Sequence, residues 1–264
     1  IVLKKILILV LLLVISFSIY TVLANIYLDR KYKQDVSSMQ TRYNLSDNIS
    51  IPNPNSISIP SSLRNYIQAS IPDHRNLSTY VNLNYSGKYR KDKYGEMYDF
   101  KVKSFYNLKN GEFVSEWFID ENRIIFDKLR EVLIGDKQIY ELKYMGVKND
   151  QEVYGQRALP YLKSRMIIDA VYFPYYYLSS SSIDYKYMSN NRTLLELNTA
   201  SGKVNFILDF NQQGNLASIT SGKFNFAGNS VSLKANYENY INYKDYNLPA
   251  SITVEIENNF DKYV

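Results

Sequence analysis

The chain has 264 residues, no cysteine, one histidine and a formal net charge of +5. Setting aside Lys4 and Lys5 leaves 29 of the 31 basic residues against 26 acidic ones, and this near balance excludes a strongly basic nucleic-acid-binding protein. The lack of cysteine excludes disulfides and thiolate metal sites, so the domain must be stable without covalent cross-links.

The N-terminal segment is apolar and uncharged from Ile6 to Leu28, directly after two lysines. At 1.5 Å per helical residue, these roughly 23 residues cover about 35 Å, enough to cross the hydrocarbon core of a bilayer. Residues 1–28 are therefore predicted to form a transmembrane anchor or a signal peptide. Val22-Leu23-Ala24 fits a cleavage site, but the apolar run continues beyond it and is longer than a typical signal core, which favours an uncleaved anchor.

The charges beside this apolar run do not settle its orientation, because Arg30, Lys31 and Lys33 follow it just as two lysines precede it. The short tail before the helix favours a domain on the extracytoplasmic side of the membrane. Cleavage after Ala24 would instead give a secreted domain.

A polar segment separates the anchor from the rest of the chain. Residues 29–58 contain two prolines among asparagines and serines, which predicts a linker. Residues 59–264 are predicted to form a single β-rich domain. This domain opens with a short helix that Ser61-Ser62 can cap, which runs through Leu63, Tyr66, Ile67 and Ser70 at helical spacing and is ended by Pro72.

After this helix the hydrophobic period changes to two residues. Such alternation is typical of strands in an antiparallel sheet with one buried face. The clearest apolar faces are Val81/Leu83/Tyr85, Tyr98/Phe100/Val102, Tyr140/Leu142/Tyr144, Val204/Phe206/Leu208/Phe210, Val231/Leu233/Ala235/Tyr237 and Ile252/Val254/Ile256. With weaker segments included, about ten or eleven strands are expected, several of them joined by glycine-containing turns.

A second helix is predicted from Leu159 to Tyr172, where apolar residues recur at helical spacing before Pro174. Two short helices cannot cover ten strands, so we expect the sheet to curl on itself with the helices in its mouth. The predicted fold is mainly β: one N-terminal transmembrane helix, then a large curled antiparallel sheet of about 10–11 strands that forms a half-barrel.

Motifs for catalysis or metal binding are absent from the sequence. His74 is the only histidine, and without a second histidine or a cysteine the serine- and cysteine-hydrolase mechanisms lack their partners. Asp209-x-Asn211-x-Gln213-Gly214 resembles the start of a calcium loop, but Thr220 occupies the position of the final acidic ligand, so a hairpin turn explains it better. No metal or cofactor is expected, and the chain is predicted not to be an enzyme.

One polar pair is a candidate for a specific role. Arg165 and Asp169 lie four residues apart on the predicted second helix and therefore share one face. They form either an ordinary helical ion pair or a desolvated pair that faces the concave side of the sheet. In the second case the pair would hold a ligand head group or lock the helix in place.

Several short motifs resemble an uncharacterised prokaryotic family of unknown function. They are Ile59-Pro60-x-x-Leu63-Arg64-x-Tyr66, Phe113-x-x-x-Trp117, Arg165-x-x-x-Asp169-x-x-x-x-Pro174, Leu208-x-Phe210 with Gly214, and Leu248-Pro249. The chain departs from the family pattern at Asp169, where the family prefers Glu, and at Tyr172 and Tyr185, where it prefers Trp. The resemblance covers roughly residues 59–264 and implies no known activity. At the level of architecture, a curled sheet with helices in its mouth is similar to the lipoprotein-carrier half-barrels of bacterial envelopes.

These observations predict a membrane-tethered, extracytoplasmic, non-enzymatic domain that binds a lipid or another hydrophobic molecule. The membrane is expected to be contacted through Ile6–Leu28, and no nucleic-acid partner is expected. The candidate lining residues are Phe100, Trp117, Phe206, Phe210 and Tyr237, with Arg165 and Asp169 at the mouth. The alternatives are a structural or interaction module of the cell envelope, in which these side chains are plain core, and an enzyme with a paired-carboxylate site.

Overall fold

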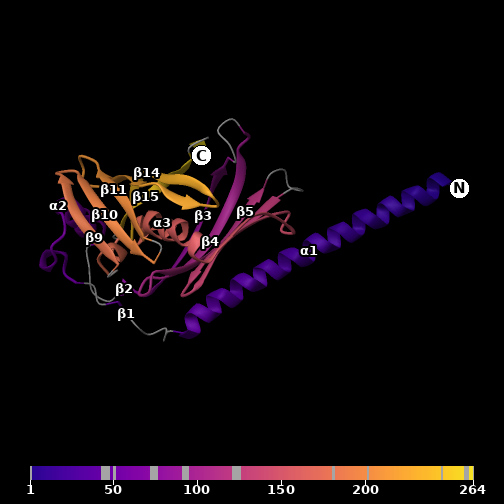
Figure 1. The fold of residues 1–264 in the computed structure, drawn as a ribbon, viewed down its shortest axis with the longest axis horizontal. Helices are drawn as coiled ribbons and strands as arrows, with labels where there is room; N and C mark the ends of the chain where they lie inside the picture. Colours follow the sequence, from indigo (N-terminus) through magenta and orange to yellow (C-terminus); the bar gives the residue numbers. More distant parts are fainter. Residues whose placement is uncertain are drawn as a thin grey trace.

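A computed structural model describes residues 2–42, 48–49, 52–71, 77–90, 95–120, 126–179, 182–200, 202–244, 246–258 and 262–263. One long helix precedes a domain built from two antiparallel sheets (Figure 1). The prediction of a mainly β protein with an N-terminal apolar helix is therefore confirmed. His74 lies outside the described residues.

Helix α1 (Val2–Arg42) is unbroken over 41 residues. By length and composition it is the one helix among the described residues that could span a membrane. Residues 29–42, which were predicted to belong to a linker, are instead helical. They contain neither glycine nor proline, and they lie against the first sheet, whose contacts stabilise a helix that polarity alone would not predict.

The first sheet is a meander of six strands in which each strand pairs with the next one in the chain. Its strands are β3 (Tyr80–Tyr89), β4 (Tyr98–Asn107), β5 (Glu112–Asp120), β6 (Phe126–Ile134), β7 (Lys137–Tyr144) and β8 (Lys148–Tyr154). The predicted turn between β4 and β5 needs Gly111, whose φ of +62° is in the left-handed region.

The second sheet has eight strands in the order β16-β15-β14-β12-β11-β10-β9, with β13 also paired to β14. They are β9 (Ile183–Ser189), β10 (Arg192–Thr199), β11 (Gly202–Phe210), β12 (Leu216–Ser221), β13 (Phe224–Phe226), β14 (Asn229–Tyr243), β15 (Tyr246–Asn258) and β16 (Lys262–Tyr263). A separate ladder joins β1 (Asn48–Ile49) to β2 (Leu77–Ser78).

Short helices connect and cover these sheets. They are η1 (Pro54–Ser56), α2 (Ser61–Ser70), η2 (Gly155–Arg157), α3 (Leu159–Asp169), η3 (Ala170–Tyr172) and α4 (Tyr176–Ser179). Both predicted helices are present. However, α3 follows β8 and carries the chain away from the first sheet, so β9 starts a new sheet. The strands therefore form two sheets rather than the single curled sheet that was expected.

One hydrophobic core lies between the two sheets. Helix α3 occupies its centre (Figure 1), and Leu162, Met166 and Ile167 on this helix are completely buried. The inward faces of both sheets and α2 contribute to the same cluster of apolar side chains. The core is therefore shared by the whole domain, and α3 is the element that both sheets contact.

Candidate functional site

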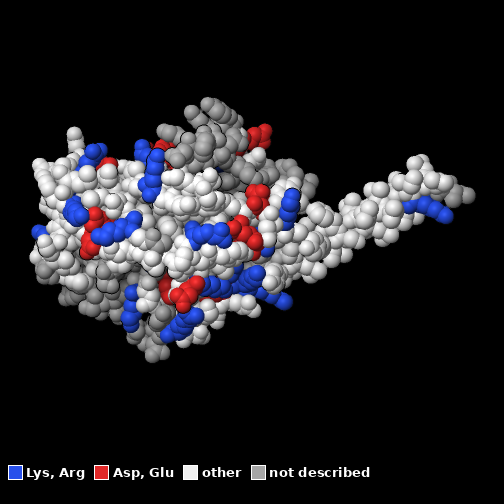
Figure 2. All heavy atoms as spheres, in the orientation of Figure 1, with Lys and Arg blue, Asp and Glu red and all other residues white. Residues whose placement is uncertain are grey.

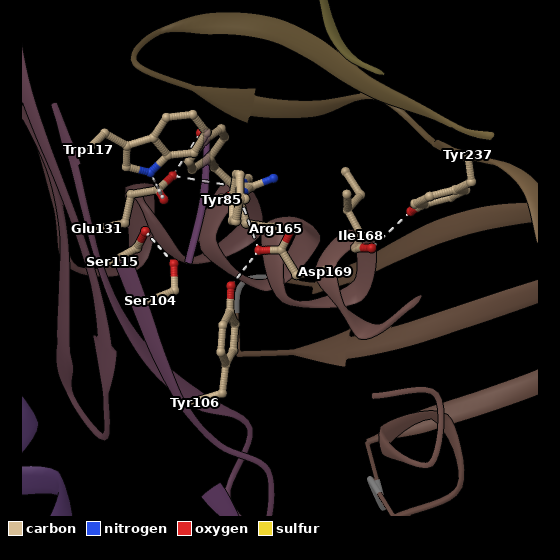
Figure 3. Close-up of polar contacts among 11 residues, drawn as sticks. Tyr85, Ser104, Tyr106, Ser115, Trp117, Glu131, Arg165, Ile168, Asp169 and Tyr237 are labelled. Atoms are coloured by element: carbon tan, nitrogen blue, oxygen red, sulfur yellow. Dashed lines mark hydrogen bonds and ion pairs between the residues drawn. The ribbon is translucent and has the colours of Figure 1, made fainter. Parts of the chain in front are cut away.

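Arg165 and Asp169 lie on α3 at the centre of the domain (Figure 3). Their residues are only 4% and 2% exposed, so they are not at an open mouth of the sheet. The helical spacing that placed them on one face is correct, and that face is turned toward the first sheet. Of the two predicted alternatives, the structure contains the desolvated ion pair rather than an exposed one.

Asp169 receives two hydrogen bonds on one carboxylate oxygen. Arg165 Nη2 donates to Asp169 Oδ2 at 3.1 Å, and the Tyr106 hydroxyl donates to the same oxygen at 2.6 Å. Arg165 Nη2 also donates to the Tyr85 hydroxyl at 3.0 Å. Tyr85 and Tyr106 come from β3 and β4, so these bonds attach the helix to the first sheet.

Glu131 on β6 is the second carboxyl group of this cluster, and its residue is fully buried. The Tyr161 hydroxyl and the Trp117 indole N–H each donate to one of its oxygens at 2.9 Å. Arg165 Nε lies 3.8 Å from Glu131 Oε1, and the guanidinium lies 5.3 Å from the centre of the Trp117 ring. The Arg165 side chain thus lies between two carboxyl groups and an aromatic face. We call these seven residues the buried charge cluster: Tyr85, Tyr106, Trp117, Glu131, Tyr161, Arg165 and Asp169.

Burial dominates the electrostatics of the buried charge cluster. It raises the pKa of both Glu131 and Asp169, although the nearby Arg165 opposes the rise. Burial would lower the pKa of Arg165, but the surrounding acidic groups, with Asp169 first, raise it well above its usual value. One permanent cation therefore faces two carboxyl groups that hold their protons more strongly than in water. This arrangement is a closed internal network, in which Arg165 serves as the common partner.

The other predicted lining residues fall into two groups. Phe206, Phe210 and Tyr237 belong to the second sheet and are buried in the common core. Phe100 and Trp117 are half-buried on the first sheet, where their ring centres are 5.2 Å apart. The structure therefore brings Trp117 to Arg165, whereas the three residues of the second sheet line the opposite side of the core.

Tyrosine hydroxyls from several elements satisfy the carbonyl groups at the end of α3. The hydroxyls of Tyr177 and Tyr237 donate to the carbonyls of Ile167 and Ile168 at 3.0 and 2.9 Å. The last carbonyls of a helix have no partner within it, so such donors remove the penalty of burying a helix end. Tyr177 and Tyr237 therefore have a structural role as long donors that reach α3.

Glu131 and three tyrosines of the buried charge cluster were not predicted from the sequence. Glu131 carried a signal, because it lies between Leu129 and Leu133 at an inward position of a strand pattern. No sequence signal singled out Tyr85, Tyr106 and Tyr161 as members of a site, because the chain has 26 tyrosines in similar sequence contexts.

A second polar cluster joins α1 to the outer face of the first sheet. Asp35 is buried and forms ion pairs with Arg130 of β6 and Lys137 of β7. Asp29 accepts a hydrogen bond from Lys103 of β4 at 2.6 Å, which, with a second lysine, lowers its pKa to about 2. Met39 is completely buried against an apolar group of the sheet that includes Phe105, Val114, Val132 and Ile134.

The contacting side of α1 has a simple spacing. Thr21, Leu28, Asp35 and Met39 are its buried residues, and Asn25 and Tyr32 between them are half-buried. These six positions are separated by four, three, four, three and four residues, the repeat of a helix that packs along one seam. We call them the docking stripe.

Among the hollows on the surface of the described part of the domain are two with defined linings. One, of about 510 Å³, lies on the first sheet and includes Lys101, Lys103, Glu116, Phe118 and Lys128 among its lining residues. The other, of about 310 Å³, lies between residues 57–59 and the start of β9. Within the described ranges, no group of three or more His, Cys, Asp or Glu residues is arranged to hold a metal ion.

The geometry defines a class of protein: a long apolar N-terminal helix that packs against a two-sheet antiparallel domain with a charged pair at its centre. Within this class, the model of a "Family of unknown function (DUF6544)" matches residues 50–263, and the chain belongs to that family. The predicted membership of an uncharacterised family is thereby confirmed. No curated protein and no solved structure matches the chain.

Proposed function

We propose that the protein is a single-pass membrane protein whose β domain is a non-enzymatic structural or interaction module with a filled core. The observation that carries this proposal is the position of α3, whose buried side chains pack between the two sheets. A hydrophobic ligand would need that same space. Interiors packed in this way support scaffolding and surface recognition rather than the enclosure of a ligand.

The buried charge cluster supports the same proposal. Arg165 Nη2 is bonded to Asp169 and Tyr85, and Arg165 Nε, which makes no hydrogen bond, lies 3.8 Å from the Glu131 carboxylate. A ligand would have to replace these bonds and leave buried charges without partners, which is costly. The cluster therefore acts as a lock between α3 and the first sheet.

Attachment to the membrane is proposed through Ile6–Leu28, with the domain on the extracytoplasmic side. Release after Ala24 is the alternative, and it would leave most of the docking stripe on the domain. The intact mass of the purified protein, together with extraction of membranes at alkaline pH, distinguishes the two. We expect an uncleaved chain that stays in the membrane; a mass that begins at Asn25 would establish release.

A hydrophobic ligand remains a second candidate, favoured by one observation. Phe100 and Trp117 are half-buried and form, with Tyr85, a group of aromatic rings at the margin of the core. A fatty chain could pack against these rings if α3 moved aside.

Native mass spectrometry of the full chain released from nanodiscs separates the two candidates. We expect the mass of the bare chain, and no saturable uptake of a fluorescent fatty acid. A bound molecule at one copy per chain would contradict the filled core. Its loss in the variant Phe100→Ala, but not in Tyr187→Ala at an exposed site, would assign it to the aromatic margin.

A further inference from the structure

The domain meets α1 within the apolar segment rather than beyond it. Gly146, in the turn between β7 and β8, lies against Asn25 and Leu28, since a Cβ at this glycine would be 3.4 Å from Asn25 Oδ1 and 3.5 Å from Leu28 Cδ1. Thr21 is also buried. One side of the last two turns of the predicted transmembrane segment therefore faces the domain, while Val22, Leu23, Ile26 and Tyr27 on the other side are exposed.

The exposed apolar side of α1 is about as long as a bilayer core is thick. It runs from Ile6 to Tyr27, and about 22 residues at 1.5 Å each give roughly 33 Å. A hydrocarbon core is about 30 Å thick. Figure 2 shows this projecting part without charged side chains except near its N-terminus. No length of helix is left over to separate the domain from the membrane surface.

Three strand pairs of the first sheet, β3 with β4, β5 with β6 and β7 with β8, end at one edge of the sheet. The residue pairs that close them are Tyr89 with Tyr98, Asp120 with Phe126, and Tyr144 with Lys148. Alternate hairpins of an antiparallel meander end at the same edge of the sheet. The turn of β7 and β8 touches α1 at Leu28, so this hairpin is level with the end of the apolar segment, and the two other hairpins end at the same edge of the sheet.

The side chains at this edge suit the boundary between lipid and water. The large apolar side chains of Met97, Phe118 and Tyr144 are 53%, 37% and 39% exposed, and Lys148, which pairs with Tyr144, is also exposed. We call these four residues the hairpin edge. Aromatic rings and lysines are enriched where a membrane protein meets the head groups, because the ring or stem is apolar and the tip is polar.

Phe118 of the hairpin edge lies between two lysines. Lys101 and Lys128 are its direct neighbours across β4 and β6. All three line the 510 Å³ hollow together with Glu116, whose carboxylate lies 3.5 Å from Lys128 Nζ. Nearer the edge, Asp99 forms an ion pair with Lys88 at 2.6 Å. The surface that would face the lipid head groups thus carries lysines together with aromatic rings.

We propose that the hairpin edge lies in the head-group region of the bilayer that holds α1, so that the domain is seated on the membrane. This inference rests on the proposed transmembrane anchor. In place of the linker expected over residues 29–58, residues 29–42 continue the helix, and the docking stripe holds this helix against the domain. A seated domain presents the same outer surface to partners at a constant distance from the membrane.

The absence of cysteine allows a direct test, because each introduced cysteine is the only labelling site. The variants Met97→Cys and Tyr144→Cys place a nitroxide on the hairpin edge. Tyr187→Cys is the matched control, because Tyr187 is 62% exposed on β9, in the other sheet. The full chain is reconstituted in phosphatidylcholine vesicles, and the label is measured for its accessibility to oxygen and to a water-soluble nickel complex.

We expect the ratio of oxygen to nickel accessibility to be several-fold higher at positions 97 and 144 than at 187. Equal ratios in protein that resists alkaline extraction would overturn the seating while leaving the anchor intact. Protein that alkaline extraction releases from the vesicles would instead overturn the proposed anchor, and the seating with it. Unchanged Trp117 fluorescence in each variant shows that the fold is retained.

Discussion

Arg165 is the single side chain on which the centre of the domain depends most. It is the shared cation of Asp169 and Glu131, so its removal leaves two buried carboxyl groups without a counter-charge. We expect Arg165→Met to lower the free energy of unfolding of the full chain in detergent by about 3–5 kcal/mol near neutral pH. Arg192→Met, which breaks an exposed ion pair with Asp209, should cost less than about 1 kcal/mol.

The decrease in the free energy of unfolding caused by Arg165→Met should also depend on pH. Burial raises the pKa of Glu131 and Asp169, and without Arg165 both pKa values rise further. A carboxyl group with a raised folded-state pKa stabilises the fold below its unfolded pKa and loses this contribution as pH rises through the folded value. Denaturant titrations should therefore show that Arg165→Met lowers the free energy of unfolding less at about pH 5 than at about pH 8. An equal loss at both values would contradict the assigned roles.

Asp29 should show the opposite pH dependence. Its pKa of about 2 is lowered chiefly by the hydrogen bond from Lys103, so its contribution is present above the usual value of 3.8 and is lost as pH falls toward 2. Thermal melts should show Asp29→Asn less stable than the parent near pH 6, with the difference closing near pH 2. Asp99→Asn removes an exposed ion pair with Lys88, and its melting temperature should stay close to that of the parent at both pH values. A constant difference for Asp29→Asn would contradict the ion pair.

At the scale of elements, the docking stripe decides whether α1 and the first sheet move together. Met39 is completely buried against the sheet, so Met39→Ala should weaken docking by about 2–5 kcal/mol. Asp35→Ala should weaken it as well, because Asp35 links the helix to two strands. Hydrogen exchange of residues 29–42 in the full chain measures this opening.

Both variants should exchange faster over residues 29–42 while β10 and β11 stay protected. Gln34→Ala, on the exposed side of the same helix, is the matched control and should exchange as the parent does. Unchanged protection in Met39→Ala would show that the helix is held in some other way.

At the scale of the whole molecule, the common core predicts that both sheets unfold together. Phe226 of β13 stacks on Tyr161 of α3 at 4.4 Å and contacts the ring of Tyr140 of β7 at 5.0 Å, so it joins the two sheets through the helix. Phe226→Ala should destabilise the domain by about 3–5 kcal/mol. In this variant, amide hydrogen exchange should become faster to the same extent in β6–β7 and in β11–β12. Separate transitions for the two sheets would contradict a single core, and Tyr187→Ala should change neither.

The sequence by itself determined the apolar helix, the strand pattern and the helix that carries Arg165 and Asp169. These features depend on periodicity within one segment, and local periodicity survives in any fold that buries one face. The helix over residues 29–42 was not predicted, because its docking stripe contains Tyr32 and Asp35 as well as Met39. An acidic residue is assigned to the solvent-exposed side of a helix unless its buried partner is known.

Only the tertiary structure decided how these elements combine. The division into two sheets, the position of α3 between them and the pairing of Arg165 with Glu131 all involve residues far apart in the chain. The same applies to the height at which Gly146 meets Leu28. Alternation in a strand states which face is buried but not what covers it, so a filled core and an open concavity have the same pattern in the sequence. Side chains from distant segments had to be placed together before the two could be told apart.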